Sequence, residues 1–361
     1  MINIAAPSIG KEEIRAVTQV LKSGSITKGE KVAELESKFA SYIGAKHAVS
    51  CSSGTAALMV GLEALGIKEG DEVITTPFTF IATSNAILYN RARPVFADID
   101  ERTFNIDPAK IESCITDKTK AVIVVHLYGQ PCEMKKIRDI CKKRGVMLIE
   151  DCAQAHGAEY MGKKVGTFGD LSAFSFYATK NMVTGEGGMI LTDNDAVAEK
   201  AAVIINQGQM GKYDHVMIGY NNRMTNIEAA IGVEQLKKLE MLTEKRIRNA
   251  SYLTKKLEGA GWLQTPYVKK GVRHVWHQYT VKVAGGVRDD FMSYLNKNGV
   301  GARVYYPKPS YMQPAYEFLG CREGTCPVSE AVSKQVVSLP VHPMLKKDDL
   351  NCIVESVKAY R

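Results

Sequence analysis

One lysine stands alone between two apolar, strand-like segments in SFYATKNMVTGEGGMIL, the stretch that runs from residue 175 to 191. Lys180 is the only charged residue between Asp170 and Glu186. An amine in apolar surroundings has a lowered pKa and can act as a neutral nucleophile. A lysine at the tip of an exposed hairpin is the ordinary alternative, but the apolar flanks on both sides favour a buried amine.

A small polar cluster, Ser53-Gly54-Thr55, follows the strand-like run HAVS and opens a helical segment. Free N–H groups and the positive end of the helix dipole can hold a phosphate there, and glycine lets the backbone approach closely. An ordinary helix N-cap is the commoner meaning of such a motif. No GxxxxGK[ST] or GxGxxG motif accompanies it, so neither a nucleoside triphosphatase loop nor a dinucleotide site is supported.

An acidic pair follows a third strand-like run, in VMLIEDCAQAHG. A carboxylate at the end of a buried strand costs free energy unless it has a partner. Asp151 precedes small residues that leave room for a ligand, so Glu150 is expected to be the less buried of the two. An N-cap or a surface acid is an equally good interpretation of Asp151 taken alone.

The elements that position these residues alternate between strand and helix patterns, which predicts a doubly wound α/β domain with a mostly parallel sheet. The last two strands are too close in sequence for a crossover helix, so they are expected to form an antiparallel hairpin. The predicted strands are 47–50, 73–76, 94–98, 121–126, 146–150, 171–176 and 188–192, and the predicted helices between them are 55–65, 79–90 and 133–144.

The three polar clusters all follow predicted strands, and ligands of open parallel sheets bind at the carboxyl ends of the strands. A phosphate site, a buried acid and an amine at one edge suit a single cofactor. Pyridoxal 5′-phosphate (PLP) needs its phosphate held, its ring nitrogen kept protonated by a carboxylate, and its aldehyde bound to a lysine.

Beyond residue 225 the pattern changes. A long helix is predicted over 225–257, capped by Thr225 or Asn226, and is followed by a smaller α+β region with helices at 288–298 and 348–359. We therefore expect a large α/β domain over 1–240 and a small C-terminal domain over 241–361, in line with the two domains that 361 residues favour.

Composition narrows the class of protein. No apolar run approaches the length of a membrane span, and the N-terminus lacks the pattern of a signal peptide, so cytoplasm is the expected compartment. Eight scattered cysteines without a CxxC pair predict free thiols and no structural metal. The net charge of +8 lies on helical patterns without a nucleic-acid motif, which suits a surface that attracts a small anion such as a nucleotide diphosphate.

Eight motifs then occur in one order along nearly the whole chain: SGTAAL, EVITTPFTFIATSNAI, PVFADIDERTFNIDP, VVHLYGQP, LIEDCAQAHGA, GDLSAFSFYATKNMVTGEGGMILT, GYNNRMTNIEAAIGVEQL and QPAY. In these motifs the chain resembles the PLP-dependent nucleotide-sugar aminotransferases of the DegT–DnrJ–StrS family. The resemblance implies the aspartate-aminotransferase-like fold called fold type I.

The resemblance also implies roles for individual residues. Lys180 would bind the cofactor's aldehyde and later move protons, Asp151 would pair with the pyridine nitrogen, and Gln154 would bond the phenolate oxygen. Phe80 would stack on the ring. Asn221 looks like the residue that reaches the phosphate of a neighbouring subunit, which implies a homodimer with shared active sites. The full implied cofactor set is Gly54, Thr55, Ala56, Phe80, Asp151, Gln154, Ser175, Lys180 and Asn221.

On the substrate side, the resemblance implies L-glutamate as amino donor and a nucleotide-linked keto sugar, aminated at the 3- or 4-position, as acceptor. Arg223, Tyr305 and Tyr306 are the candidate substrate residues, and a structural ion pair is an equal alternative for Arg223. Tyr305 stands where many members have histidine, so the sugar stays open. A PLP-dependent dehydratase, a keto-inositol aminotransferase and a non-catalytic PLP-binding regulator are the competing interpretations.

Overall fold

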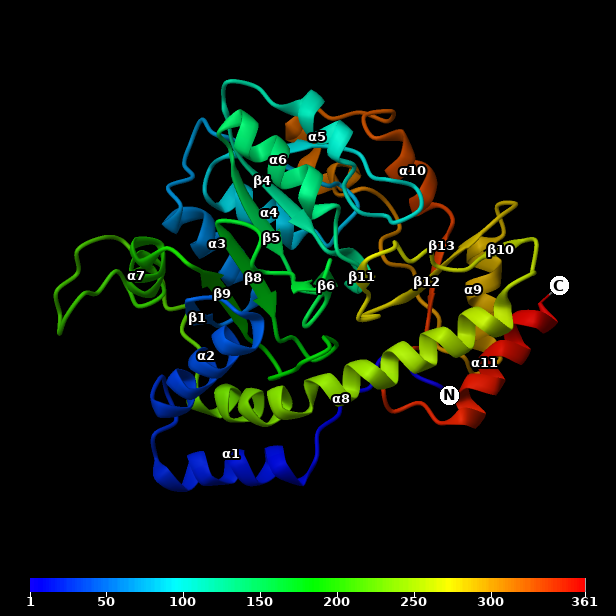
Figure 1. Cartoon of the computed structure of the whole chain (residues 1–361), viewed down its shortest axis with the longest axis horizontal. Helices are drawn as coiled ribbons and strands as arrows, with labels where there is room; N and C mark the ends of the chain where they lie inside the picture. The colour runs from blue at the N-terminus through cyan, green and yellow to red at the C-terminus, as the bar shows by residue number, and fades with distance from the viewer. Residues whose placement is uncertain (361) are drawn as a thin grey trace.

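A seven-stranded sheet forms the centre of the molecule in the computed structural model, which describes residues 1–360 (Figure 1). Its strand order is β1-β9-β8-β5-β4-β2-β3. All neighbours run parallel except those of β9, which pairs antiparallel with β8 and β1. The predicted mostly parallel sheet and the predicted closing hairpin are both confirmed. The strands are β1 (His47–Cys51), β2 (Glu72–Thr75), β3 (Arg93–Phe96), β4 (Thr119–Val125), β5 (Met147–Asp151), β8 (Leu171–Ser175) and β9 (Gly188–Thr192).

Helices cover both faces of this sheet, which explains why its strands read as continuous apolar runs. All five residues of β9 are buried, yet Ile190 packs into one core while Met189 and Leu191 pack into another. The first core includes α3 (Gly54–Ala64), α4 (Ala82–Tyr89) and α7 (Asp195–Ile204), and the second includes α2 (Glu30–Ile43) and the first half of α8 (Asn226–Leu257).

The long helix α8 begins with a capping box. Thr225 accepts a hydrogen bond from the N–H of Glu228 and the Glu228 carboxylate accepts from the N–H of Thr225, so Thr225 is the cap. Asn226 instead accepts from the N–H groups of Lys31 and Val32 at the start of α2. The second half of α8 packs into the core of the C-terminal region, and the division of domains near residue 240 falls within this continuous helix.

The C-terminal region has its own small antiparallel sheet and apolar core. The N-terminal residue Ile2 joins this core and pairs with Val300, so the chain's start lies beside the C-terminal region (Figure 1). The sheet contains β10 (Leu263–Gln264), β12 (Tyr279–Val283) and β13 (Val336–Leu339), flanked by α9 (Arg288–Lys297) and α11 (Lys347–Ala359). The remaining elements are α1 (Lys11–Ser23), α5 (Pro108–Cys114), α6 (Met134–Arg144), α10 (Pro327–Ser333), β6 (Glu159–Tyr160), β7 (Lys163–Lys164) and β11 (Val272–Arg273).

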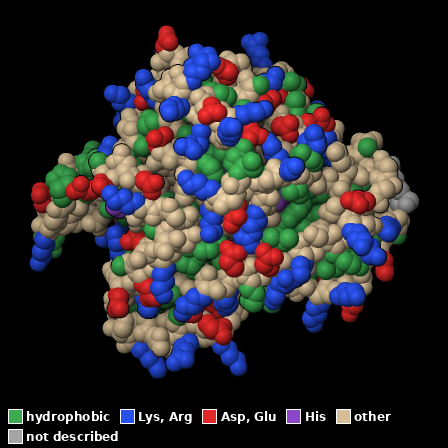
Figure 2. Space-filling model, viewed as in Figure 1, with side chains coloured by type: hydrophobic (Ala, Val, Ile, Leu, Met, Phe, Trp, Pro, Cys, Tyr) green, Lys and Arg blue, Asp and Glu red, His purple; other side chains and the backbone are tan. Residues whose placement is uncertain are grey.

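A projecting arm, residues 206–221, follows α7 and extends away from the body of the molecule (Figure 1). Figure 2 shows hydrophobic side chains on this projection. Tyr213 is 81% exposed and Ile218 is 87% exposed, and Met210 and Val216 are also exposed. Large apolar side chains grouped on one exposed segment are typical of a surface that contacts another protein.

All eight cysteines carry free thiols, as the sequence predicts. Within residues 1–360 no helix combines the length and the apolar character that crossing a bilayer requires.

Candidate active site

A cavity of about 1300 Å³ opens where the carboxyl ends of β1, β5 and β8 meet. Its wall combines the large α/β region with residues of the C-terminal region and of the chain's start. Most of the predicted site residues line this cavity: Gly54, Thr55, Phe80, Asp151, Gln154, Ser175, Lys180, Tyr305 and Tyr306. Three predicted residues, Ala56, Asn221 and Arg223, are not among the residues of this chain that line it.

The N-terminus of α3 forms one wall of the cavity. Ser53 caps the helix by accepting a hydrogen bond from the N–H of Ala56 at 3.1 Å, so that amide is already used and Ala56 is buried. The N–H groups of Gly54 and Thr55 have no partner within residues 1–360. These two amides, at the positive end of the helix dipole, can therefore bind an anion.

Gly54 is required for a close approach between this helix and the sheet. A Cβ at position 54 would lie 2.6 Å from the Cβ of Ser175, at the end of β8. Glycine therefore allows the first amides of α3 and the Ser175 hydroxyl to face the same space. The family resemblance includes Gly54, Thr55 and Ser175 among the implied cofactor residues, all three expected at the phosphate, and the structure brings them together.

Lys180 follows β8 in a tight turn, in which its N–H donates to the carbonyl of Tyr177 at 2.8 Å. Its side chain is half-buried because it lines the cavity. Burial lowers the pKa of Lys180 to about 8, and the negative charge of Asp151 partly opposes this effect. With this pKa, roughly a tenth of the amine is neutral at pH 7, far more than for an ordinary lysine, and the neutral form is the one that acts as a nucleophile.

Asp151 ends β5 and is buried at the floor of the cavity. Thr83 Oγ1 on α4 donates a hydrogen bond to its carboxylate at 2.8 Å, and the N–H of Ala153 donates another at 3.1 Å. Burial raises the pKa of Asp151, and these two donors together with the charge of Lys180 act against that rise. These two hydrogen bonds hold the Asp151 carboxylate in one orientation. The carboxylate can still accept a hydrogen bond from a positively charged group in the cavity.

Glu150 is fully buried, so the expectation that it is the less buried acid of the pair is wrong. Successive residues of β5 point to opposite faces, and the Glu150 carboxylate lies within the layer on the side away from the cavity. It accepts hydrogen bonds from the N–H groups of Gly166, Phe168 and Gly169. Burial alone would raise the pKa of Glu150, but these bonds and the contact with His126 outweigh burial and lower it.

His126 and Cys152 lie beside Glu150, with ligand atoms within 4.8 Å of one another. A metal ion could fit such a spacing. Both oxygens of Glu150, however, are already accepting hydrogen bonds from His126 Nε2 and from backbone N–H groups. Burial raises the pKa of the Cys152 thiol well above its usual value, so it is protonated. We therefore interpret the cluster as a hydrogen-bonded support beneath Asp151.

Gln154 is positioned by two hydrogen bonds from different parts of the chain. Its Oε1 accepts from the N–H of Tyr128 at 2.7 Å, and its Nε2 donates to the Tyr306 hydroxyl at 3.0 Å. The carbonyl of Tyr305 in turn accepts from the Tyr128 hydroxyl. These contacts connect the sheet end to the loop that carries Tyr305 and Tyr306.

Phe80 lies at the open side of the cavity and is 57% exposed, with its ring centroid 6.3 Å from that of Tyr306. The helix predicted over 79–90 begins only at Ala82. Thr79 and Phe80 therefore belong to a loop and line the cavity. A ring placed here can cover one face of a planar ligand.

Two sets of cavity residues were missed by sequence reasoning. Thr83 lies in the quoted motif PFTFIATSNAI, four residues after Thr79, and only the fold brings its hydroxyl to Asp151. Residues 3–5 line the opposite wall, although no motif in the sequence marks them. Their position depends on pairing with residues about 300 positions later in the chain.

Asn221 and Arg223 lie at the base of the projecting arm. Arg223 donates from Nε to Asn221 Oδ1 at 3.0 Å and from Nη1 to Asn206 Oδ1 at 3.0 Å. Among the described residues it pairs with amide oxygens and with no carboxylate, so the ion-pair alternative is not what the structure contains.

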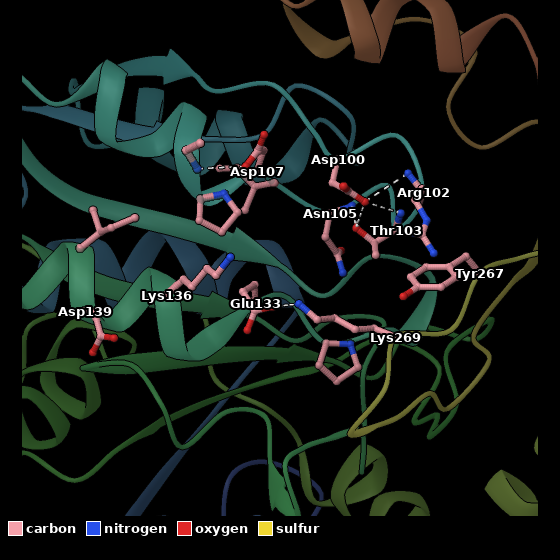
Figure 3. A pocket seen from close by; sticks show the side chains of 15 residues that line it. Asp100, Arg102, Thr103, Asn105, Asp107, Glu133, Lys136, Asp139, Tyr267 and Lys269 are labelled. Atoms are coloured by element: carbon pink, nitrogen blue, oxygen red, sulfur yellow. Dashed lines mark hydrogen bonds and ion pairs between the residues drawn. The ribbon is translucent and has the colours of Figure 1, made fainter.

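A second groove, of about 560 Å³, lies between α5, α6 and residues 267–269 (Figure 3). Most of its polar groups are already paired with one another. Asp107 caps α5, Glu133 pairs with Lys269, and Arg102 stacks on the ring of Tyr267 at 3.7 Å. This groove contains none of the predicted site residues, and the amine-bearing cavity remains the candidate active site.

Comparison with known proteins agrees with this geometry. The sequence model of the DegT/DnrJ/EryC1/StrS aminotransferase family matches residues 7–358. The chain belongs to this family. It is accordingly an aminotransferase with the fold-type-I architecture.

Named relatives cover nearly the whole chain. It is 40% identical to the dTDP-3-amino-3,6-dideoxy-alpha-D-galactopyranose transaminase of Aneurinibacillus thermoaerophilus, over 97% of this chain and 95% of the relative. It is 38% identical to the GDP-perosamine synthase of Caulobacter vibrioides, over 99% of this chain and 97% of the relative. The crystal structure of S. venezuelae DesV in complex with a ketimine intermediate superposes with a TM-score of 0.94 at 34% identity, covering 97% and 94% of the two chains.

Proposed function

We propose that this protein is a PLP-dependent aminotransferase that moves an amino group from L-glutamate to a keto sugar carried on a nucleotide diphosphate. The observation that carries the proposal is the meeting of Lys180, Asp151 and the N-terminus of α3 in one cavity. Family membership supports the reaction type, and relatives named for nucleotide-linked amino sugars support the substrate class.

The residues present fit PLP. The unpartnered amides of Gly54 and Thr55 suit its phosphate, with the Ser175 hydroxyl beside them. Asp151 suits the ring nitrogen, and Gln154 in the same cavity suits the ring oxygen because its Nε2 has a second N–H besides the one that bonds Tyr306. When bound, PLP supplies an electron sink that allows an amino group to be exchanged between two carbon skeletons.

The chain's own residues supply proton transfer and orientation. The low pKa of Lys180 leaves its Nζ able to give up and accept a proton near neutral pH, which suits a group that moves protons during the reaction. Asp151, held by Thr83, would provide a fixed negative charge for the ring nitrogen. Phe80 and Tyr306 border the cavity, where their rings can contact a planar ligand.

The acceptor is defined only as a class. The two named relatives carry different nucleotides in their names, GDP in one and dTDP in the other, so similarity alone does not select the nucleotide. Tyr305 stands on the cavity wall where many family members have histidine, and the choice between the 3- and 4-keto carbon is assigned to this loop.

We also propose a cytoplasmic homodimer with shared active sites. Asn221 and Arg223 lie outside the cavity of their own chain, at the base of an arm with exposed apolar side chains. If the arm packs against a second copy, these residues can reach the partner's phosphate site, as the family resemblance implies.

The test is the product formed from a panel of nucleotide-linked 3- and 4-keto sugars and an inosose, each supplied with L-glutamate and the cofactor-loaded protein. Mass spectrometry should find an amino sugar with one of the nucleotide sugars, accompanied by 2-oxoglutarate. Dehydration without amination, or amination of the inosose alone, would replace the proposed substrate class. Loss of the visible absorbance of the bound cofactor on adding glutamate would exclude a non-catalytic binding role.

A further inference from the structure

The cavity wall contributed by the C-terminal region carries a second cation. Apart from Lys180, Arg303 has the only positively charged side chain among the described residues that line the cavity. Arg303 lies two residues before Tyr305, in the segment that connects α9 to the loop with Tyr305 and Tyr306. Arg303 therefore lines the cavity next to the loop that carries Tyr305 and Tyr306.

The backbone that carries Arg303 is fixed from three directions. The start of the chain pairs with it, because the N–H of Ile2 donates to Gly299 at 2.7 Å and the N–H of Gly301 donates to Ile2 at 2.8 Å. A Cβ at position 301 would lie 2.7 Å from the carbonyl oxygen of Ile2, so glycine permits this contact. Asn296 bonds both the N–H and the carbonyl of Ala302, each at 3.1 Å.

Arg303 itself exchanges two backbone hydrogen bonds with Ser338, at 2.7 and 3.2 Å. Its side chain, in contrast, is exposed to the cavity and makes no ion pair or hydrogen bond with any of residues 1–360. The other charged groups on the cavity wall do not neutralise it. Asp151 is occupied by Thr83 and Ala153, and Glu186 is exposed without a bond to Arg303.

A guanidinium on a rigid backbone, free of protein partners and facing a substrate cavity, is suited to bidentate recognition of a carboxylate or a phosphate. Both substrates of the proposed reaction carry such groups, the donor as carboxylates and the acceptor as a diphosphate. Nearby, burial raises the pKa of Tyr305, and the charge of Arg303 acts to lower it.

We propose that Arg303 binds an anionic group of a substrate, either a carboxylate of the amino donor or the diphosphate of the nucleotide sugar. This inference rests on the proposed function and adds to it a residue of the C-terminal region that anchors the substrate. Because the amino donor and the nucleotide can each be represented by a separate unreactive probe, the two sources of the anion can be distinguished by experiment.

The experiment measures binding of unreactive probes to the cofactor-loaded protein by isothermal titration calorimetry. Glutarate stands for the donor, and UDP, GDP and dTDP stand for the nucleotide. Arg303→Gln should weaken the binding of one of the two probe classes roughly tenfold or more, as loss of a charge-assisted hydrogen bond does. Arg303→Lys should weaken it less, because the charge remains but the fork geometry is lost.

Lys297→Gln is the matched control, since this lysine is exposed at the end of α9 and does not line the cavity. It should leave every probe's affinity unchanged. Weaker glutarate binding assigns the donor carboxylate to Arg303, and weaker binding of a nucleoside diphosphate assigns the diphosphate. Equal affinities in wild type and Arg303→Gln, in a protein that binds PLP and transaminates, overturn this inference while leaving the proposed function intact.

Discussion

Lys180 combines two properties that a surface lysine lacks, a desolvated amine and a carboxylate in the same cavity. Desolvation lowers its pKa to about 8, and Asp151 pulls that value upward. The neutral, nucleophilic amine therefore accumulates as pH rises through about 8 in the cofactor-free protein. An unperturbed lysine would remain protonated until about pH 10.4.

A pH series of cofactor capture tests this property. The rate at which cofactor-free protein acquires the visible absorbance of bound PLP should rise with pH and level off above about 8, measured by stopped-flow. Asp151→Asn removes the charge that raises the lysine pKa, so the midpoint should move to lower pH. A midpoint near 10 in wild type, or an upward shift in the variant, would contradict the assigned environment.

Glu150 is a residue whose importance is structural. Replacing it with glutamine keeps the size of the side chain but removes the charge that faces three backbone N–H groups and His126. We expect Glu150→Gln to lower the free energy of unfolding by about 2–4 kcal/mol at neutral pH, measured by urea titration. Glu112→Gln, at an exposed ion pair, is the control and should have a much smaller effect.

The pH dependence of this effect follows from the lowered pKa of Glu150. The stabilisation is present above the pKa of an unfolded glutamate and is lost as pH falls through the folded value. The difference between wild type and Glu150→Gln should therefore shrink in acid. If the difference in the free energy of unfolding stayed constant from neutral pH to strong acid, the charge of Glu150 would contribute nothing to stability.

At the scale of elements, the sequence predicts the central sheet well because its strands are buried on both faces and read as apolar runs. It also predicts the hairpin of β8 and β9 from the short connection. The predicted helix boundary is wrong where tertiary contacts determine it. Helix α4 begins at Ala82, because the preceding residues form a loop that lines the cavity. The sequence also does not predict that residues 3–5 line the cavity, because their position depends on the pairing of Ile2 with Val300.

The junction between α3 and β8 gives an element-scale prediction. Gly54→Ala would place a Cβ 2.6 Å from the Cβ of Ser175, so the helix start must move away from the strand end. The phosphate-binding amides would move with it, and PLP affinity should fall roughly tenfold or more, a loss of about 1.4 kcal/mol or more. Fluorescence titration with PLP measures this change.

Gly261→Ala serves as the control, because a Cβ there would meet no atom within 4 Å. Its PLP affinity should equal that of wild type. If Gly54→Ala also bound PLP with unchanged affinity, the start of α3 would not be the phosphate site.

At the scale of the whole molecule, the projecting arm explains why Asn221 and Arg223 lie outside their own cavity. Ile218→Asp places a charge at the most exposed apolar residue of the arm. If the arm packs against a second copy, burial of that charge is costly and the protein should become monomeric, as measured by light scattering after gel filtration. Because the partner's Asn221 would no longer reach the phosphate site, cofactor affinity should fall as well.

Phe318→Asp changes an aromatic residue that is 71% exposed and lies outside the arm, and it should leave the oligomeric state unchanged. A dimer that survives Ile218→Asp would exclude the arm as the interface. A monomeric wild type with full activity would exclude shared active sites altogether.

The proposed function depends most on one bond, between the cofactor and Lys180. Reduction of the PLP-loaded protein with borohydride makes this bond permanent, and peptide mass spectrometry then identifies the lysine that carries the label. We predict a single labelled site at Lys180, which is lost in Lys180→Ala. A label on another lysine, or no covalent label in a protein that still transaminates, would contradict the central claim.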